Sequence, residues 1–567
     1  MFESALRTFV DYANHWVWET PTQFPWMVAL LLGAGIFITF RMGWINIRFF
    51  KHSIDVIRGK FDNPEDSGDI NHFQALSTAL SATIGIGNIA GVALGIHYGG
   101  PGILLWMWIS GIFGMSLKYS EATLAHYYRV FDRKGNASGG PMYYIERGLG
   151  KKWKWMAVLF AMFTIISSFG IGNMNQSNTV AVSAASEFHL PDWLVGIVLS
   201  VLVALVILGG IRRIGAVTSR LVPFMAVLYI FAALYILVSH TGQLPDVFAR
   251  IVSDAIKPKA AYGGTVVGVW HFTLLWGIRR ALFSNEAGMG SAPIAHAAAK
   301  TKEPVREGVV AMIGPFVDTL LICTLTGLVI VLTNVWDQKK FETRYLDAGK
   351  ITIYEDKGPI AGDRILHSDD TLKPVLFSGR TRVVDGKAGA VLFEVNDAFV
   401  ENPVLLLEDA PYTGEMIIEN GLCRDADGNT LHLNIRGKML QNSSELTAFA
   451  FFSGFKKYGK VGTVLVALCV FLFGISTIIS WSYYGDRCVE YLFGARYVVY
   501  YRIVYVIFIY FGAILALETV WAYGDMALGL MVVPNLLGVL LLSPRLAVLT
   551  RAYKYKLLSG KQKETQE

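Results

Sequence analysis

The sequence predicts an all-α polytopic membrane protein with about eleven transmembrane helices and a small β-rich insertion. Of its 567 residues, 53% are hydrophobic and 17% are charged, whereas charged residues make up about a quarter of ordinary soluble proteins. The apolar residues gather into runs of about 20, the length that a helix needs to cross a hydrocarbon layer about 30 Å thick. Together these observations exclude an ordinary soluble fold.

The predicted spans follow one another along the chain with one long interruption. They cover residues 24–40, 73–96, 102–125, 156–182, 194–211, 221–238, 266–297, 309–332, 461–484, 498–517 and 521–542. The sequence does not begin with a short apolar stretch followed by a small-residue cleavage site, so we expect the first span to remain in the mature protein.

Lys and Arg gather in alternate loops, which should therefore be cytoplasmic. These clusters lie within residues 41–60, 129–134, 151–152, 212–220, 300–306, 487–496 and 545–556. The pattern predicts a multi-pass protein of the cell inner membrane with its N-terminus outside and its C-terminus in the cytoplasm. A net charge of +6 would also suit a nucleic-acid binder, but the basic residues form no single stripe, so no nucleic-acid partner is expected.

Hydropathy collapses between residues 335 and 445. Short β-branched runs at residues 391–395, 402–410 and 431–440 alternate with turn signals such as Asp385-Gly386 and Asp427-Gly428. We interpret this segment as an extracytoplasmic β-rich domain; the alternative is a long disordered loop. The chain then divides into a first membrane part (1–334), the insertion (335–445), a second membrane part (446–545) and a basic cytoplasmic tail (546–567).

Two spans contain an unusual concentration of helix-breaking residues. SATIGIGNIAGVALG (81–95) and LFSNEAGMGSAPIAHAA (282–298) place glycines in the middle of strong apolar runs, where each glycine costs about 1 kcal/mol relative to alanine. The second stretch also contains Pro293, which cannot donate a helical hydrogen bond. We therefore expect each of these helices to be broken.

An unwound stretch at membrane depth must line a cavity or lie against protein, because lipid cannot satisfy its backbone. Free N–H groups at a half-helix suit a carboxylate and freed carbonyls suit a cation, so each break suits an amino acid bound with an ion. The breaks also fall at matching positions if spans two to six and seven to eleven form two units of opposite topology. One extra helix followed by such a 5+5 inverted repeat is the arrangement of a secondary transporter. The alternative for a single glycine-rich span is close helix packing.

Ionisable side chains inside spans are costly and usually have a function or a partner. Glu286 lies at the second break, where it either ties the two half-helices together or meets a substrate ammonium group. Asp318 is interpreted as a packing or relay group. Lys118 and Glu121 are spaced to form an i, i+3 ion pair. The sequence leaves the two roles of Glu286 open.

Hydroxyl and amide side chains also occur at membrane depth. Ser476 and Thr477 in the ninth span carry hard neutral oxygens that suit sodium, although isolated hydroxyls in spans more often bond to their own helix. In the fourth span, Asn173, Asn175 and Gln176 would be costly against lipid, so they should point into a cavity. The four cysteines show neither a disulfide framework nor metal-ligand spacing.

At these motifs the chain resembles the alanine or glycine:cation symporter family of prokaryotes, whose core resembles the bacterial leucine transporter. The matching stretches are TIGIGNIAGVA, SGGPMYYIERGLG, GIGNMNQSN, FSNEAGMGSAPIAHAAAKTKEPVREG and GISTIISWSYYGDRCVEYLFG. The resemblance covers nearly all membrane segments. It implies ten core helices after one extra span, with substrate and sodium at the two breaks.

The resemblance also implies residue roles. The unwound turn at Gly85 would offer the amides of Ile86 and Gly87 to the substrate carboxylate, and the pocket would be completed by Asn173, Ser284, Asn285, Glu286 and Gly288. One sodium position would lie at Asn88 and the Thr83 carbonyl, and a second at the carbonyls of Ser81 and Ile84 with Ser476 and Thr477. The insertion departs from the family pattern, in which a short loop is usual.

The expected function is therefore sodium-coupled symport of alanine or glycine into the cell, with Na⁺ as coupling ion and without an organic cofactor. Proton coupling, an exchange mode, and an extracytoplasmic binding or sensing protein anchored by its spans are the alternatives. An enzyme is not expected, because the spans contain no HExxH or GxSxG motif and no paired His or Cys ligands.

Overall fold

The structure is a computed structural model of the chain. It describes residues 9–559 except residues 11, 22–23, 64, 132–134, 257–268, 346–350, 356–375, 390, 396–397, 420–421 and 516. The start of the predicted seventh span (266–268), parts of the predicted insertion and the end of the basic tail (560–567) lie outside the described residues.

The described chain is mostly helical. Its α-helices are α2 (Trp26–Arg41), α3 (Ile45–Arg48), α4 (Phe50–Ile57), α5 (His72–Thr83), α6 (Val92–Gly99), α7 (Ile103–Tyr127), α8 (Pro141–Leu149), α9 (Lys154–Phe169), α10 (Asn175–Phe188), α11 (Asp192–Ile207), α12 (Gly210–Ser239), α13 (Leu244–Ile256), α14 (Val269–Asn285), α15 (Ala292–His296), α16 (Pro304–Ala311), α17 (Ile313–Pro315), α18 (Thr324–Leu332), α19 (Ser443–Gly454), α20 (Val461–Phe493), α21 (Val498–Ile514) and α22 (Leu517–Leu558). Wider π-helical turns interrupt three of the predicted spans, namely η2 (Gly87–Gly91), η4 (Gly170–Met174) and η6 (Phe316–Cys323).

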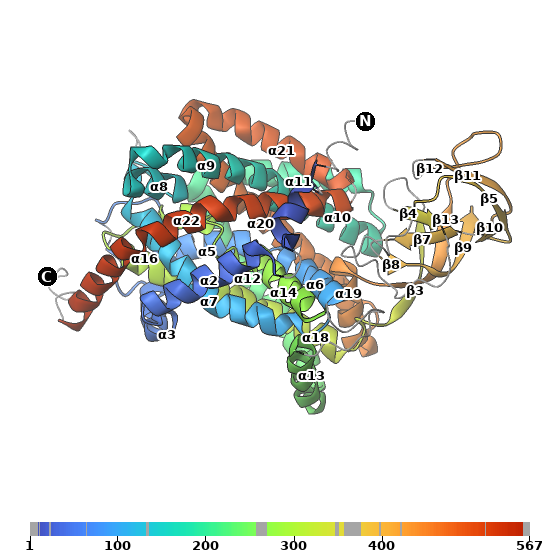
Figure 1. Ribbon diagram of the computed structural model, residues 1–567, viewed down its shortest axis with the longest axis horizontal. Helices are drawn as coiled ribbons and strands as arrows, with labels where there is room; N and C mark the ends of the chain where they lie inside the picture. Colours follow the sequence, from blue (N-terminus) through green and yellow to red (C-terminus); the bar gives the residue numbers. More distant parts are fainter. Residues whose placement is uncertain are drawn as a thin grey trace.

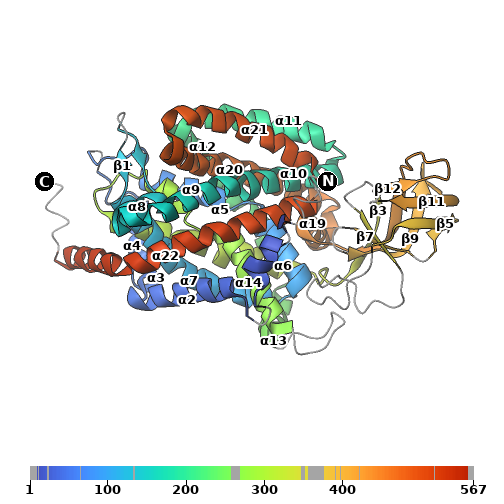
Figure 2. The same ribbon diagram turned by 45° about the horizontal axis from the view of Figure 1, so that its top comes forward.

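The long helices run side by side along the long axis of the molecule, and α20 packs against α5, α9, α10, α12, α19 and α21. The strands between residues 339 and 440 lie at one end of this helical body and the C-terminus lies at the other (Figures 1 and 2). The first interrupted helix, α5–α6, lies against both α20 and α14, so it belongs to the interior of the bundle.

The lengths of the described helices fit a membrane protein. Those long and apolar enough to cross a membrane are Lys151–Phe188, Gly210–Ser239, Pro304–Leu332, Val461–Phe493, Ala495–Ile514 and Val520–Leu558. The pair α5 and η2–α6 qualifies as one bent span, and α2 and α11 are shorter apolar helices. α7 and α14–α15 lie where the third and seventh spans are predicted. The count of eleven and the inverted repeat stay predictions.

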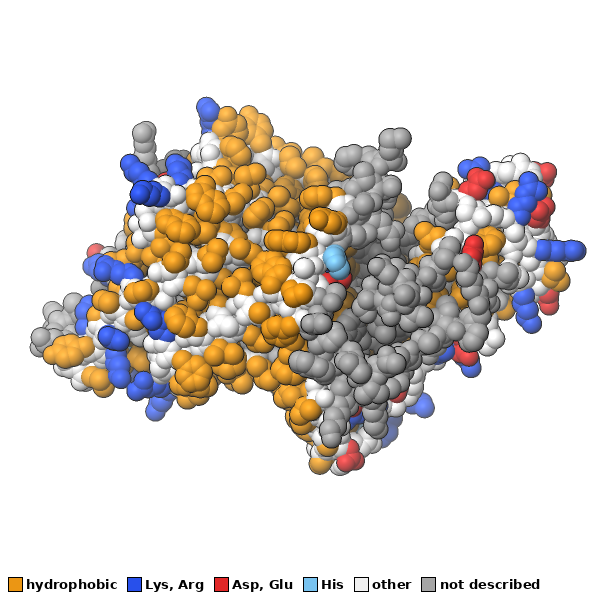
Figure 3. Space-filling view, viewed as in Figure 1, with side chains coloured by type: hydrophobic (Ala, Val, Ile, Leu, Met, Phe, Trp, Pro, Cys, Tyr) orange, Lys and Arg blue, Asp and Glu red, His pale blue; other side chains and the backbone are white. Residues whose placement is uncertain are grey.

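The outer faces of the bundle are apolar. Leu205 on α11, Phe231 on α12 and Tyr500 on α21 are more than half exposed, which water would penalise but lipid would not. On the helical body in Figure 3, hydrophobic side chains are widely spread and Lys and Arg gather at the end that holds the C-terminus, whereas the β-rich part carries both Lys or Arg and Asp or Glu. This pattern is typical of a membrane-embedded helical domain with one basic surface.

Antiparallel strands fill much of the predicted insertion. They are β3 (Lys339–Tyr345), β4 (Ile351–Glu355), β5 (Gly379–Val384), β6 (Lys387–Ala388), β7 (Val391–Val395), β8 (Ala398–Phe399), β9 (Glu401–Leu407), β10 (Ala410–Pro411), β11 (Gly414–Glu419), β12 (Leu422–Arg424) and β13 (Asn434–Leu440). They form sheets of order β10-β9-β13-β3, β12-β11-β5-β6 and β4-β7-β8 around their own hydrophobic core. A further short pair joins β1 (Val130–Phe131) to β2 (Ala137–Ser138).

One turn in the insertion shows why its sequence favours strands. Asp385 and Gly386 join β5 to β6 with φ angles of 51° and 76°. Two consecutive positive φ values define the tight turn that matches the twist of antiparallel strands, and Asp-Gly is among its preferred sequences. The strands at 391–395, 401–407 and 434–440 coincide with the short apolar runs of the sequence. The exact domain boundaries stay predictions.

Cys423 in β12 provides a test of this small core. Its side chain is buried, and burial raises the pKa of the thiol to about 11. At pH 8 only about one molecule in a thousand would then carry the reactive thiolate. We expect iodoacetamide to label Cys423 at least about a hundredfold more slowly in the native protein than after unfolding, as measured by peptide mass spectrometry.

The same raised pKa predicts the direction of the pH dependence. The protonated Cys423 thiol should contribute fully to the free energy of unfolding below about pH 8.5. This contribution should be lost as the pH rises toward 11. If iodoacetamide labels Cys423 rapidly in the native protein at pH 8, the thiol is not buried.

Candidate functional site

The first predicted interruption is present in the structure. α5 ends at Thr83, and the chain resumes as η2 and α6 with the two halves bent by 50°. The N–H of Gly85 donates to Asn88 Oδ1 (3.0 Å), and the N–H of Ile86 donates to Gln176 Oε1 (3.2 Å). Both acceptors are amide oxygens, the neutral counterparts of carboxylate oxygens. The break therefore presents N–H donors at membrane depth to which an anionic oxygen can bind.

The glycines of this break allow neighbouring elements to approach closely. A Cβ at Gly85 would lie 2.4 Å from Thr477 Oγ1 on α20, and a Cβ at Gly87 would lie 2.9 Å from Phe283 on α14. Neither approach leaves room for a larger residue. The unwound segment is consequently enclosed by α20 on one side and by the second interrupted helix on the other.

Hydroxyl groups join α5 to α20 beside the break. Ser81 donates to the carbonyl of Ser476 (2.7 Å), and Thr477 donates to the carbonyl of Ser81 (3.0 Å). The Thr83 hydroxyl bonds back to its own helix at the Ala79 carbonyl, while the Thr83 carbonyl accepts from the N–H of Gly85. The predicted residues Ser81, Ser476 and Thr477 thus lie together and present several oxygen atoms to one another.

The second predicted interruption is also present. α14 ends at Asn285, and α15 begins at Ala292 after a turn in which Glu286, Gly288 and Gly290 have φ angles of 56°, 93° and 81°. Glu286 is not a glycine, so its left-handed backbone is strained and must be held by its surroundings. One such support is Asn285, whose Oδ1 accepts from the N–H of Ala287 (2.9 Å).

The Glu286 carboxylate connects three elements. It accepts a hydrogen bond from Ser291, which immediately precedes α15, and another from the indole N–H of Trp481 on α20 (2.9 Å). Of the two roles that the sequence left open, this geometry is that of a tie between the half-helices. Trp481 in turn packs against Gly172 in η4, where a Cβ would lie 2.4 Å from the indole side chain.

Asp318 joins the two interrupted helices to each other. Its carboxylate accepts from Asn88 Nδ2 in the first break (2.6 Å) and from the Ser284 hydroxyl at the end of α14 (2.7 Å). Thr319 contributes a third hydrogen bond (2.8 Å) and also accepts one from Asn285 (2.9 Å). Asp318 is fully buried and forms no ion pair with any described residue. It lies in η6, a π-helical segment of the kind often found at functional sites.

The amides of the fourth span lie in different places. Asn173 donates to the Tyr505 carbonyl on α21 (2.7 Å), and no hydrogen bond described here joins it to either break. Gln176, almost one turn further along, reaches the first break at Ile86. Sequence reasoning placed both amides in a cavity and chose Asn173 for the pocket, which stays a prediction. It did not single out Gln176 as a partner of the first break, because the residue pattern does not reveal the π-turn η4.

Lys118 and Glu121 do not form the expected ion pair. Glu121 accepts from Asn535 Nδ2 (2.5 Å), which also donates to the Gly288 carbonyl (2.8 Å), so Glu121 supports the second break through Asn535. Lys118 is buried, and its Nζ has no hydrogen-bond partner among the described residues. It lies within electrostatic range of Glu121, Glu286 and Asp318.

A cluster of charged and aromatic side chains closes one side of the site. Arg279 and Arg280 near the end of α14 both pair with Asp525 on α22, at 2.5 and 2.7 Å. On the same two helices, Phe283 of α14 stacks on Trp521 of α22, with ring centroids 5.0 Å apart. These contacts join α14 to α22 on the side of the second break away from α15.

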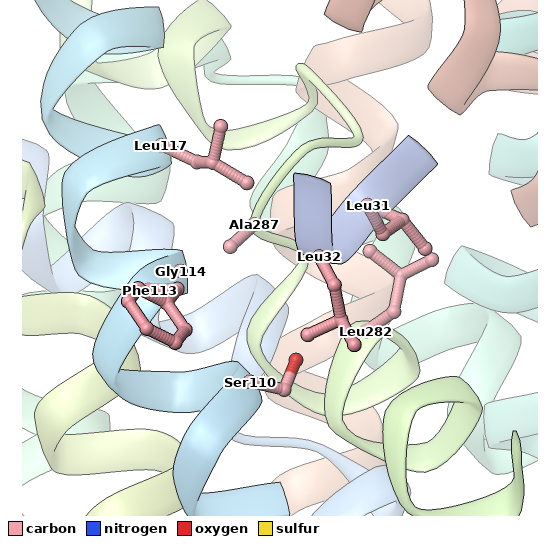
Figure 4. Close-up of a pocket in the computed structure, with 8 residues that line it drawn as sticks. All are labelled: Leu31, Leu32, Ser110, Phe113, Gly114, Leu117, Leu282 and Ala287. Atoms are coloured by element: carbon pink, nitrogen blue, oxygen red, sulfur yellow. The ribbon is translucent and has the colours of Figure 1, made fainter. Parts of the chain in front are cut away.

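The site is enclosed in this conformation. All predicted substrate and sodium residues are buried. Figure 4 shows a small cavity between α2, α7 and the turn after α14, lined by Leu31, Leu32, Ser110, Phe113, Gly114, Leu117, Leu282 and Ala287. The space open to the centre of a water molecule is about 10 Å³, so the cavity can hold roughly one water and is too small for an amino acid.

The tie between Trp481 and Glu286 can be tested by a double-mutant cycle. Hydrogen bonds to charged groups contribute about 1.5–3 kcal/mol, so Trp481→Phe should lower the free energy of unfolding by about that amount beyond the loss of ring area. In a Glu286→Gln background the cost should shrink, because the acceptor is then neutral. Reversible unfolding in detergent measures each value.

Trp108→Phe is the matched control for this cycle. Trp108 donates to a neutral acceptor, the Thr324 hydroxyl, at 2.8 Å in a half-buried position. Loss of this hydrogen bond should lower the free energy of unfolding by about 1 kcal/mol, whichever residue occupies position 286. If Trp481→Phe lowers the free energy of unfolding equally with Glu and with Gln at position 286, the indole does not stabilise the carboxylate.

Comparison with known proteins identifies the family. The chain matches the sodium:alanine symporter family over residues 3–352 and 430–567. It is 37% identical to the sodium/alanine symporter AgcS of Methanococcus maripaludis, over 96% of this chain and 97% of that protein. It is 30% identical to the probable sodium/glutamine symporter GlnT of Bacillus subtilis, over 99% of this chain and 93% of that protein.

Among solved structures, a manganese transporter of Eremococcus coleocola aligns with a TM-score of 0.42 and 12% identity, over 78% of this chain and 74% of that one, too low a score to support an inference. The family match spans both interrupted helices, η6 and α20, and therefore every element that builds the candidate site. This chain belongs to the sodium:alanine symporter family.

Proposed function

We propose that this chain is a secondary transporter that carries alanine, and glycine as a smaller substrate, across the cell inner membrane together with Na⁺. The observation that carries the proposal is the junction of the two interrupted helices. Asn88 and Ser284 both donate to the Asp318 carboxylate, at 2.6 and 2.7 Å, so side chains at or next to both breaks meet at one buried polar centre. A zwitterion and a monovalent cation are the ligands that suit such a centre.

The substrate carboxylate would bind at the first break. The N–H groups of Gly85, Ile86 and Gly87 are the proposed donors, and Gln176 Oε1 now holds one of them. A carboxylate oxygen would take the place of that amide oxygen and form the stronger, charge-assisted hydrogen bond. Gln176 would then move aside, which couples substrate binding to a rearrangement between the first break and α10.

The rest of the substrate would face the second break. Asn173, Ser284, Asn285, Glu286 and Gly288 stay the proposed pocket residues. Phe283 and Thr477 crowd the first break, which favours a small side chain. The relative named as a probable glutamine symporter makes competition by glycine, serine, glutamine and leucine the direct test of pocket size.

Na⁺ would occupy one or both oxygen-rich positions beside the breaks. Asn88 and the Thr83 carbonyl form the first proposed position, to which we add Asp318 because it bonds directly to Asn88. Ser81, Ile84, Ser476 and Thr477 form the second. Sodium prefers such hard oxygen ligands, and the Asp318 carboxylate would supply the compensating negative charge.

The membrane arrangement follows from the distribution of charge. The end with the C-terminus carries the gathered Lys and Arg side chains and the β-rich part lies at the other end (Figures 1 and 3). We therefore propose a cytoplasmic C-terminus, an extracytoplasmic insertion and an external N-terminus. An inverted repeat like that of the leucine transporter would let the two halves move around the site, so that it opens alternately to each side.

Cation dependence tests the central proposal. Proteoliposomes should take up labelled alanine when Na⁺ is outside and should lose that uptake when K⁺ replaces Na⁺ at constant pH. Asp318→Asn should raise the Na⁺ concentration for half-maximal uptake by about tenfold or more, because the position loses its only negative charge. Asp246→Asn, at an exposed site on α13, is the matched control and should leave this value unchanged.

The outcomes separate the alternatives. Uptake driven by a pH gradient in the absence of Na⁺ would indicate proton coupling in place of sodium coupling. Uptake that occurs only when the vesicles contain alanine would indicate an exchanger. If Asp318→Asn leaves the sodium dependence unchanged, the cation does not bind at Asp318.

The insertion can be removed without cutting the helical body. Tyr345 in β3 faces Asn434 in β13, so residues 346–433 can be replaced by an Asn-Gly turn that closes the remaining hairpin. We expect this variant to retain sodium-dependent alanine uptake, since every element of the candidate site remains. Folded protein that has lost uptake would instead assign the insertion a direct part in transport, as the sensing alternative requires.

A further inference from the structure

A second buried polar cluster lies outside the candidate site. Glu307 on α16 accepts hydrogen bonds from two histidines at once: His72 Nδ1 lies 2.5 Å from Oε2, and His296 Nδ1 lies 2.5 Å from Oε1. All three side chains are at most 1% exposed. An ionised carboxylate can only accept, so both Nδ1 atoms carry protons in this arrangement.

The two histidines belong to the two interrupted helices. His72 is the first residue of α5, and His296 is the last residue of α15. Glu307 therefore joins the ends of both helices that lie farthest from the breaks, on the opposite side of the site from the Arg280–Asp525 pair. A motion that separates these ends must break at least one of the two hydrogen bonds.

Backbone contacts reinforce the same junction. Ile70 and Ala299 form a parallel bridge, and the N–H of Lys300 donates to the Ile70 carbonyl (2.8 Å). Gly68 fits tightly here, because a Cβ would lie 2.6 Å from the Ala299 carbonyl oxygen. The segments before α5 and after α15 are thus closed against each other.

Arg129, just beyond α7, fastens both segments. Its guanidinium donates to the carbonyls of Ala297 (2.9 Å), Ala299 (2.6 Å) and Thr301 (3.0 Å) on one segment and of Ser67 (2.8 Å) on the other. Arg129 also lines a hollow of about 660 Å³ with Tyr127, Tyr128, Tyr143, Glu146, Arg147, Gly150 and Lys151. Arg129 therefore belongs both to the closed junction and to the lining of this hollow.

The cluster has the chemistry of a latch and not of a metal site. The two imidazoles contact different carboxylate oxygens, and no group of three His, Cys, Asp or Glu side chains in the described part of the chain could hold a metal ion. A buried carboxylate that loses its donors is costly unless water replaces them. The junction would therefore open only if water entered around Glu307 and replaced the imidazole donors.

We propose that Glu307 is a positioning residue for transport: through His72 and His296 it holds the ends of the two interrupted helices together, and release of these bonds opens the site toward the hollow at Arg129. The inference rests on the proposed function for its meaning in a transport cycle. The latch itself is a property of the fold and can be measured without any substrate.

Thr301 provides a reporter for opening. It is 1% exposed and lies in the segment that Arg129 fastens, so a cysteine introduced by Thr301→Cys should react with a maleimide only when the junction opens. Glu307→Gln removes one of the two acceptor oxygens. We expect it to raise the labelling rate of residue 301 in the full-length protein by about tenfold, quantified by peptide mass spectrometry.

Three variants make this readout specific. Glu303→Gln is the matched control, because Glu303 lies on the same face one turn earlier and pairs with Lys556 at the surface; it should leave labelling unchanged. His296→Leu removes one donor and should act like Glu307→Gln. His296→Asn keeps an amide N–H near the position of Nδ1 and should restore slow labelling, a rescue that general loss of stability would not give.

Uptake kinetics supply an independent readout. A population shifted toward the open junction should raise the KM for external alanine while leaving the maximal rate of alanine exchange within about twofold. Unchanged labelling in both Glu307→Gln and His296→Leu would overturn the latch, even if alanine uptake is normal. Increased labelling without any alanine uptake would support the latch and reject the proposed substrate instead. If Glu307→Gln does not fold, the pair of His296 variants decides the question.

Discussion

Burial of the Asp318 carboxylate in the middle of the bundle is the constraint on which the arrangement of both interrupted helices depends. A carboxylate without a cation at membrane depth is costly unless every lone pair finds a donor. Asn88, Ser284 and Thr319 supply these donors from the first break, the second interrupted helix and Asp318's own segment. Because the donors come from three elements, the breaks cannot move apart without exposing the charge. A cation at the same place would relieve that constraint.

Backbone irregularity makes such a centre possible. In a regular helix the backbone N–H and C=O groups are hydrogen-bonded to one another. The two breaks and the π-turns η2, η4 and η6 free some of these groups, and the π-turns also widen the helices around the site. Glycine then permits the close approach of neighbours, as where Gly172 receives the Trp481 ring. Trp481 reaches the Glu286 carboxylate from there. Irregular backbone in four helical segments thereby produces one dense polar centre.

The positions of the breaks could be predicted from the sequence because glycine and proline act locally on helix stability. The membrane class and the strands of the insertion follow from similarly direct patterns, whereas the meeting of Ser81 with Ser476 and Thr477 is implied by the family resemblance. Three contacts could not be predicted in this way. They are the hydrogen bonds of Asp318, the hydrogen bond between Gln176 and Ile86, and the hydrogen bond that Glu121 accepts from Asn535 in place of an ion pair with Lys118. Each depends on which way a side chain turns within a π-helical or tertiary context, and the spacing of residues along the chain carries no such information.

The site lies between two closures of different chemistry. Arg279 and Arg280 close one side through Asp525, with a guanidinium charge that keeps its pairing at any physiological pH. Glu307 closes the other through two imidazoles, which are weaker bases. Both closures act on the interrupted helices, since α14 carries the arginines and α5 and α15 carry the histidines. In the proposed transport cycle, a change at either break would therefore reach both closures, and the polar centre at Asp318 would govern which of them opens.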